Sequence, residues 1–196
     1  GLAGSETLGQ SVTSTFNNKN VGTGKTVTVN SITLSDGSNG GLAGNYTIST
    51  GQTTTANITA KALTVSGITA SNKTYDANTV ATLDLTGTSY SGLVAGDDIS
   101  ISATGTFDTK NVGTGKTVNI SSSYSGVDVG NYSITDQSST TANITASVSG
   151  ITIIGITASN KNYDGNNSAT LDTSNVSYSG LVDGDDCLLY TSDAAD

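Results

Sequence analysis

Residues 61–78 read K-A-L-T-V-S-G-I-T-A-S-N-K-T-Y-D-A-N and carry both signals from which the architecture can be argued. Leu63 and Val65 alternate with polar neighbours, and a period of two places both side chains on one face of a β-strand. The closing Asp76-Ala77-Asn78 holds the short polar residues that favour turns. A close copy of the middle of this stretch, I-T-A-S-N-K-N-Y-D, begins at Ile156, 88 residues after Ile68. The sequence therefore predicts internal repeats rich in β-structure.

Other motifs return at nearly the same distance. N-V-G-T-G-K-T starts at Asn20 and again at Asn111, 91 residues later, and N-Y-x-I starts at Asn45 and again at Asn131, 86 residues later. The period is therefore 86–91 residues, with the length changes expected in loops.

These spacings predict where the repeats begin and end. Residues 1–60 are expected to be the C-terminal part of a truncated repeat, 61–146 a complete repeat, and 147–186 the N-terminal part of a third. The junction after Ala60 has no Gly/Ser tract, and so short a connection leaves neighbouring repeats little hinge freedom.

Within residues 61–146 the apolar residues repeatedly alternate with polar ones, and clusters of Gly, Asn and Asp separate these segments. No segment shows a sustained helical period. Six or seven short strands in about 86 residues are typical of an immunoglobulin-like sandwich. The predicted fold class is therefore all-β, with tandem immunoglobulin-like β-sandwich repeats of 86–91 residues. The alternating sets are Leu63/Val65, Ala81/Leu83/Leu85, Ile99/Ile101/Ala103, Val118/Ile120, Tyr132/Ile134 and Ala142/Ile144/Ala146.

The last ten residues, Cys187–Asp196, read C-L-L-Y-T-S-D-A-A-D and differ in composition from the rest of the chain. They resemble a translation of the end of a transposase-based sequencing adapter, so we expect them not to be native protein. Cys187, the one thiol of the chain, is therefore not a candidate nucleophile or metal ligand.

Charge and composition narrow the function classes. The formal net charge is −9, His is absent, and the seven lysines are scattered without forming a basic patch, which argues against nucleic acid and anionic membranes as partners. No apolar run approaches the roughly 20 residues of a membrane span. We therefore expect neither a nucleic-acid partner nor membrane insertion of this stretch.

The glycine-rich segment Gly113–Thr117, like its copy Gly22–Thr26, invites comparison with a phosphate-binding loop. That loop needs an earlier Gly, but Lys110 and Lys19 stand at the required positions, and a strand pattern follows where a helix is needed. A hairpin turn is the favoured interpretation.

The acidic pair Asp97-Asp98 offers the oxygen ligands that Ca²⁺ prefers and is the candidate metal site, although its spacing is not that of an EF-hand loop. Asp128 could join it if the fold brings it there. A solvated turn is the simpler interpretation. Serine chemistry would need a base, and the chain has no His, so we expect no enzyme and no cofactor.

The segments I-T-A-S-N-K-T-Y-D-A-N at 68–78 and I-T-A-S-N-K-N-Y-D-G-N at 156–166 resemble the YDG domain, a repeat of filamentous hemagglutinin-like bacterial surface adhesins. In the first copy Ala77 replaces the Gly that gives the domain its name, whereas Gly165 keeps it. Because Ala tolerates positive φ less well than Gly, we expect the two turns to differ. The motif residues singled out as a structural turn are Tyr75, Asp76, Tyr163, Asp164 and Gly165, with both tyrosines expected to anchor the turn through ring packing and a hydroxyl hydrogen bond.

The resemblance implies an extracellular repeat on a bacterial cell surface, associated with the outer membrane. The expected function is a stalk or spacer that extends and presents a distal binding region, with neighbouring repeats of the same chain as its partners. In the alternative, each repeat is itself an adhesion module that binds a host glycan or surface protein. A parallel β-helix is the rival fold, but it predicts rungs of about 20 residues.

Overall fold

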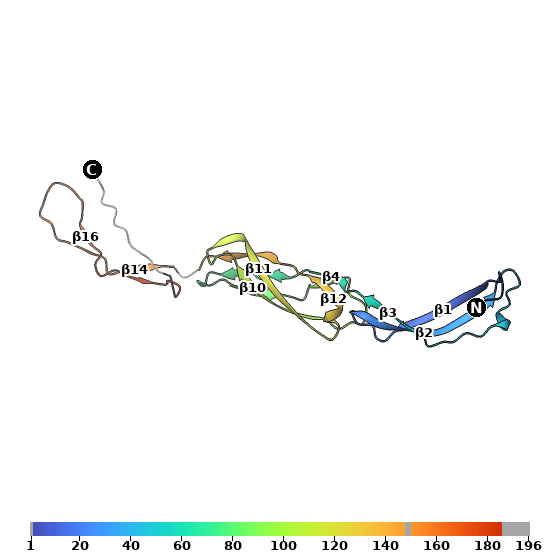
Figure 1. Cartoon of the computed structure of the whole chain (residues 1–196). Coiled ribbons are helices and arrows are strands. Elements are labelled where there is room, and N and C mark those ends of the chain that lie inside the picture. The colour runs from blue at the N-terminus through green and yellow to red at the C-terminus, as the bar shows by residue number, and fades with distance from the viewer. Residues whose placement is uncertain (1, 148–149, 186–196) are drawn as a thin grey trace. The chain divides into compact units, whose positions relative to one another are not determined.

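The computed structural model describes residues 2–147 and 150–185 (Figure 1). In this part of the chain the regular structure is β-strand, apart from two short 3-10 turns, so the predicted all-β class is confirmed. No helix in these residues is long and apolar enough to cross a membrane. Contacts divide the chain into two compact units.

The elements follow one another closely. The 3-10 turns are η1 (Ala43–Asn45) and η2 (Val129–Asn131). The strands are β1 (Leu8–Phe16), β2 (Gly22–Asp36), β3 (Thr53–Ile58), β4 (Lys61–Ser66), β5 (Thr69–Ala70), β6 (Lys73–Thr74), β7 (Val80–Ala81), β8 (Leu83–Asp84), β9 (Ser89–Ser91), β10 (Ser100–Phe107), β11 (Gly113–Ser125), β12 (Tyr132–Thr135), β13 (Ser139–Thr145), β14 (Thr152–Ile154), β15 (Thr157–Ala158), β16 (Leu171–Asp172) and β17 (Ser177–Ser179).

The two units do not follow the boundaries predicted from the repeat spacing. The first unit comprises 1–65, 90–101 and 124–136, and the second comprises 66–89, 102–123 and 137–196, as far as these segments are described. The first unit therefore combines the stretch before residue 61 with three pieces of 61–146. The boundaries at residues 60 and 146 remain predictions about the sequence repeat.

The first unit holds an antiparallel sheet of order β1-β2-β3, seen as long blue strands in Figure 1, with a bulge between Thr13 and Ser14. It also holds most of a three-stranded sheet of order β12-β4-β9, in which β12 and β4 run parallel and Ile134 pairs with Leu63. Leu63 and Val65 are fully buried, so the strand and the inward face predicted from their alternation are confirmed.

The second unit holds most of a five-stranded sheet of order β6-β13-β11-β10-β7. Its core consists of alternate residues from four of these strands, as a period of two requires. Gly105 of β10 has no room for a side chain, because a Cβ there would lie 2.7 Å from the Leu83 side chain and 3.2 Å from that of Ala81. The buried members are Ala81, Phe107, Val118, Ala142 and Ile144.

The two glycine-rich segments lie at the predicted hairpins, since the Asn17 N–H bonds to the Thr26 carbonyl and the Asp108 N–H to the Thr117 carbonyl, and each segment is also a bulged strand start. The register shifts between Gly113 and Lys116, and the same shift occurs between Gly22 and Lys25. Gly115 takes a φ of 61°, which lets the strand absorb the extra residue. Asn143 on the neighbouring strand stabilises the bulge, because its Oδ1 accepts a hydrogen bond from the Gly115 N–H at 2.7 Å.

Candidate functional site

The candidate acid Asp97 lies in the loop between β9 and β10. Both of its carboxylate oxygens accept hydrogen bonds from residues of the first unit. Its Oδ1 accepts a hydrogen bond from the Lys19 ammonium at 2.9 Å, and its Oδ2 accepts one from the Tyr132 hydroxyl at 2.6 Å. Tyr132 is buried and opens β12. Three distant segments therefore meet at one carboxylate.

Asp128, immediately before η2, joins this group through the same lysine. The side-chain nitrogen of Lys19 lies 2.8 Å from Asp128 Oδ1, and Asp128 Oδ2 accepts a hydrogen bond from the backbone N–H of Asp98 at 3.0 Å. Asp128 is 6% exposed, so little water reaches its carboxylate. The Lys19 ammonium compensates the negative charge instead. We call Lys19, Asp97, Asp128 and Tyr132 the Lys19 cluster.

The electrostatics of the Lys19 cluster favour the charged forms of its acids and its lysine. Hydrogen bonds from Tyr132 and Lys19 lower the pKa of Asp97, and the bond from Lys19 lowers the pKa of Asp128. The two carboxylates in turn raise the pKa of Lys19. Burial and the bond to Asp97 raise the pKa of the Tyr132 hydroxyl.

The fold thus brings Asp128 to Asp97, as the calcium hypothesis required, but the cation between them is an ammonium group. Asp98 contributes its backbone N–H to the arrangement. No group of three or more His, Cys, Asp or Glu residues that could hold a metal occurs within residues 2–147 and 150–185. The sequence has a second acidic pair, Asp185-Asp186, of which Asp186 lies outside the described residues.

A second tyrosine makes the same contacts as Tyr132. The Tyr132 hydroxyl accepts a hydrogen bond from the Val94 N–H at 3.0 Å while donating to Asp97. In the same way the Tyr46 hydroxyl accepts from the Ala3 N–H at 3.0 Å and donates to Glu6. We call this arrangement the tyrosine clamp, because one phenol joins a backbone amide to a carboxylate three residues further on.

The lysine contact also recurs, in the second unit. Lys110 occupies the place of Lys19 in the K-N-V-G-T-G-K motif, and Asp185 occupies the place of Asp97 in the G-D-D motif. The Lys110 ammonium lies 2.8 Å from Asp185 Oδ1, which also accepts a hydrogen bond from the Tyr75 hydroxyl at 2.6 Å. Lys110 and then Tyr75 lower the pKa of Asp185.

Sequence reasoning assigned Tyr132 to a strand and gave Lys19 no role. One signal could have revealed the contact of Tyr132. Glu6 and Asp97 stand at matching positions of the repeat, and each is followed one strand pair later by the N-Y-x-I tyrosine. An acid and a tyrosine that recur together indicate a contact, whereas a recurring tyrosine alone indicates only a strand.

The two aspartates of the turn motif each accept hydrogen bonds from within their own turn. Asp76 Oδ1 accepts a hydrogen bond from the Asn78 N–H at 3.2 Å and one from the Lys73 ammonium at 2.6 Å. Asp164 does the same with Asn166 at 3.1 Å and Lys161 at 2.9 Å. The lysine lowers the pKa of the aspartate in both turns.

The expectation that Ala77 and Gly165 would give different turns is wrong. Ala77 has a φ of 61° and Gly165 a φ of 78°, so both lie in the left-handed region. The lysine contacts explain why Ala77 accepts this strain: Lys73 donates hydrogen bonds to Asp76, to the Asn78 side chain and to two backbone carbonyls. These bonds hold the turn whichever residue occupies its centre.

The two motif tyrosines differ. Tyr75 packs against the core of the second unit, with the Lys110 ammonium 6.0 Å from its ring centroid. Tyr163 is 97% exposed, so the packing predicted for it is wrong. Tyr75 also directs its hydroxyl to Asp185 and away from its own turn, so the turn is anchored by the aspartate and the lysine.

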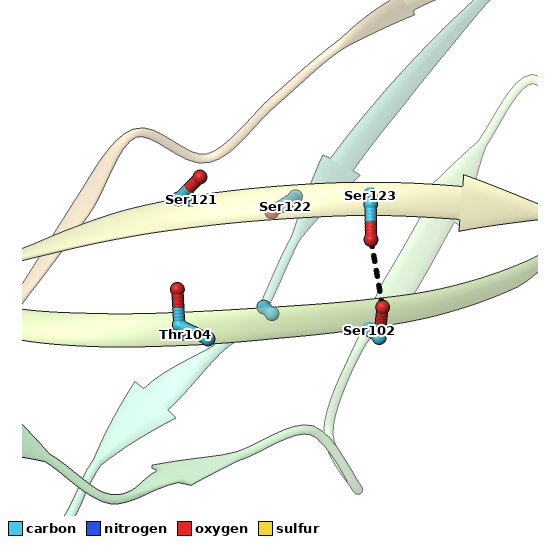
Figure 2. A pocket seen from close by; sticks show the side chains of 6 residues that line it. Ser102, Thr104, Ser121, Ser122 and Ser123 are labelled. Carbon is cyan, nitrogen blue, oxygen red and sulfur yellow. Dashed lines mark hydrogen bonds between the residues drawn. The ribbon is translucent and has the colours of Figure 1, made fainter.

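A shallow hollow of about 220 Å³, lined mainly by serine and threonine residues, lies along β10 and β11 in the second unit. Figure 2 shows Ser102 and Ser123 facing each other across the two strands, where their hydroxyls are 2.7 Å apart. Thr104 and Ser121 line the hollow beside them. With hydroxyls but no basic group on its walls, the hollow has no activated nucleophile.

The family model of the YDG domain matches residues 1–56 and 59–142. No curated protein matches the chain, and no solved structure does. The matched segments contain the tyrosine clamps and the turn at Asp76. They cover more than half of the sequence, and the chain therefore belongs to the YDG domain family.

Proposed function

We propose that this chain is a spacer of a secreted bacterial surface adhesin, built from tandem immunoglobulin-like β-sandwich repeats that extend and present a distal binding region. The protein works outside the cell, at the bacterial surface and associated with the outer membrane. Membership of the YDG domain family and the all-β structure support this assignment.

The recurring lysine–aspartate pair is the observation that carries the proposal. Lys19 belongs to 1–60 and Asp97 to 61–146, so their contact joins two successive predicted repeats. Lys110 and Asp185 do the same for 61–146 and 147–186. A contact that each repeat makes with the next is what a linear array of mutually supporting modules needs.

The covalent connection supports the same function. β3 ends at Ile58 and β4 begins at Lys61, so only Thr59 and Ala60 separate two strands of the first unit. An isolated exposed ion pair adds little stability, but the Lys19 cluster combines a buried carboxylate, a buried tyrosine and a short linker. Together these features restrict bending at the junction.

Small-angle X-ray scattering of residues 1–196 tests the spacer. A compact chain of this length would have a radius of gyration of about 16 Å. We expect a clearly larger value with the profile of an elongated particle, whereas a value near that of the globule would overturn the proposal. The variant Lys19→Ala/Lys110→Ala should broaden the distribution of sizes because its junctions bend.

Lys25→Ala is the matched control for the junction variant. Lys25 is the second lysine of the same motif, and its ammonium binds Asn18 within the β1–β2 hairpin. We expect this variant to scatter like the parent chain. Specific, saturable binding of the whole chain to glycans or host cells, abolished by loop substitutions, would instead support the adhesion-module alternative.

A further inference from the structure

The first and last segments of the stretch 61–146 pair with each other in parallel at two places. In the first unit β4 lies beside β12, and Lys61 stands opposite Tyr132. In the second unit β6 lies beside β13, and Lys73 stands opposite Ile144. The partners are 71 residues apart in both ladders, from 61 to 132 and from 73 to 144.

Two side chains add bonds between these ladders. The Gln137 carboxamide bonds to the backbone of Ile68 in both senses: its Oε1 accepts from the Ile68 N–H at 2.9 Å, and its Nε2 donates to the Ile68 carbonyl at 2.7 Å. It thereby takes the place of a peptide group on a neighbouring strand. Asn72 Oδ1 accepts a hydrogen bond from the Asn143 N–H at 2.7 Å.

The paired segments lie where the chain enters and leaves the predicted repeat. β4 begins at Lys61, separated from β3 by Thr59 and Ala60 alone, and β13 ends at Thr145. The core strands β7, β10 and β11 belong to the stretch between the paired segments, 76–131. A pull on the chain from both sides therefore reaches the paired segments before it reaches the core.

The parallel direction of the strands decides how such a pull acts on the hydrogen bonds. The first strand is drawn back toward its N-terminal end, and the last strand is drawn forward toward its C-terminal end. Two parallel strands drawn in this way slide along each other, so all the bonds that run across the ladder resist together. Strands that are pulled apart at one end lose their bonds one after another instead.

Either ladder alone can transmit the tension. If the β6–β13 ladder opens, β4 still passes the load to β12 and the chain that follows it. If the β4–β12 ladder opens, the load runs along 61–74 and crosses from β6 to β13. The stretch 76–131 comes under tension only when both ladders have failed.

We propose that the two parallel ladders, with the bonds of Gln137 and Asn72, form a clamp that lets this repeat bear tensile load without unfolding. The inference rests on the proposed function, because a spacer held between a cell and a bound target is under tension. It extends that function from setting a distance to carrying a force. We call the two ladders and these side-chain bonds the parallel clamp.

Single-molecule force spectroscopy of the whole chain tests the parallel clamp through the direction of the pull. Handles are attached to introduced cysteines in a background that carries Cys187→Ser. Ala60→Cys with Gly150→Cys pulls across the repeat and loads both ladders lengthwise. Ala60→Cys with Val127→Cys, at a residue that is 86% exposed, pulls on the N-terminal ends of β4 and β12 and opens their ladder from one end. We expect the lengthwise unfolding force to be several times the higher of the two.

The double variant Asn72→Ala/Gln137→Met removes the side-chain bonds of the parallel clamp. It should unfold at a lower lengthwise force, because forced unfolding follows the unfolding rate and these bonds must break first. Val118→Ala is the matched control, since Val118 is fully buried in the core of the second unit but lies outside the clamp. This control should lose equilibrium stability in urea and keep most of its lengthwise unfolding force.

Unchanged far-ultraviolet circular dichroism shows that each variant is folded. Equal unfolding forces in the two pulling directions would overturn the proposal, and so would a double variant that keeps the full lengthwise force. These outcomes are distinct from a failure of the spacer, which is measured by scattering: a compact particle would overturn the spacer whatever force the repeat withstands.

Discussion

The phenol of Tyr132 joins the backbone of Val94 to the carboxylate of Asp97, accepting a hydrogen bond from the amide and donating one to the acid. The ring is buried, so both bonds are shielded from water. The same bonds at Tyr46 fix the loop that bears Glu6. The loop between β9 and β10 thus takes its shape from a residue of β12.

We expect Tyr132→Phe to lower the thermal unfolding midpoint by a few degrees, because it leaves the Val94 amide and the Asp97 carboxylate short of one partner each. Differential scanning calorimetry of the whole chain measures the change. Tyr163→Phe is the control: this side chain is 97% exposed, so its midpoint should equal that of the parent. Equal unfolding midpoints for the two variants would show that the tyrosine clamp does not stabilise the fold.

The Lys19 cluster should make stability depend on pH at both ends of the scale. The folded pKa values of Asp97 and Asp128 lie below the ordinary 3.8, so their contribution is complete above that pH and is lost as the pH falls through the lowered values. The folded pKa of Lys19 lies above 10.5, so its contribution is complete below pH 10.5 and is lost as the pH rises through the raised value.

Urea unfolding at a series of pH values measures this dependence, with Lys19→Met as the comparison. The variant should be less stable than the parent near neutral pH, and the difference should shrink toward both extremes. A difference that stays constant with pH would contradict the ion pairs.

Ala77→Gly should stabilise the second unit by about 0.5–1 kcal/mol, because Gly relieves the cost of a left-handed φ at Ala77 while adding some freedom to the unfolded chain. The reverse change, Gly165→Ala, should cost about 1 kcal/mol for the same reason. Chemical unfolding of the single variants gives both values. Two changes of the same sign would show that φ is not what distinguishes these positions.

Gly126→Ala should disturb the Lys19 cluster without touching any of its side chains. Gly126 has a φ of 124°, and a Cβ there would lie 2.2 Å from the Asp98 carbonyl oxygen, so the loop that carries Asp128 would have to move. The thermal midpoint should fall, and the acid-side pH dependence should weaken. Gly130→Ala, where a Cβ has nothing within 4 Å, is the control and should retain both properties.

The core of the second unit sets its stability. Phe107 is 2% exposed, and Phe107→Ala should cost about 3–5 kcal/mol through lost burial and the cavity it leaves. Val80→Ala, at a residue that is 69% exposed on the neighbouring β7, should change stability by less than about 0.5 kcal/mol. Guanidinium unfolding compares the two variants, and a small effect at Phe107 would contradict the core assignment.

The strands could be predicted from the sequence because a period of two is a local signal. Leu63 with Val65, and Val118 in β11, were placed on buried faces by alternation alone, and the structure confirms them. The pairing of the strands was not predictable in this way. That β12 lies parallel to β4 depends on groups far apart in the chain, and alternation says nothing about partners.

The candidate sites were harder for a related reason. The turns at Asp76 and Asp164 follow from short-range bonds and were found from the sequence. The role of Lys19 depends on acids that only the folded chain brings within 3 Å, so no local pattern marks it. At Tyr163 the sequence predicted a contact that the structure lacks. This residue shares its motif with Tyr75, but its ring is exposed where that of Tyr75 packs against the core.

The recurrence of the pairs Lys19–Asp97 and Lys110–Asp185 has a genetic consequence on the proposed repeat organisation. Unequal recombination between two copies removes or duplicates one whole period. At every new boundary the lysine of one copy's K-N-V-G-T-G-K motif is again followed by a copy that carries the acid it pairs with. The gene can therefore gain or lose whole periods while every carboxylate that corresponds to Asp97 keeps its lysine. A deletion of any other length would leave such a carboxylate without its lysine. Alleles of this locus should accordingly differ by multiples of the 86–91-residue period.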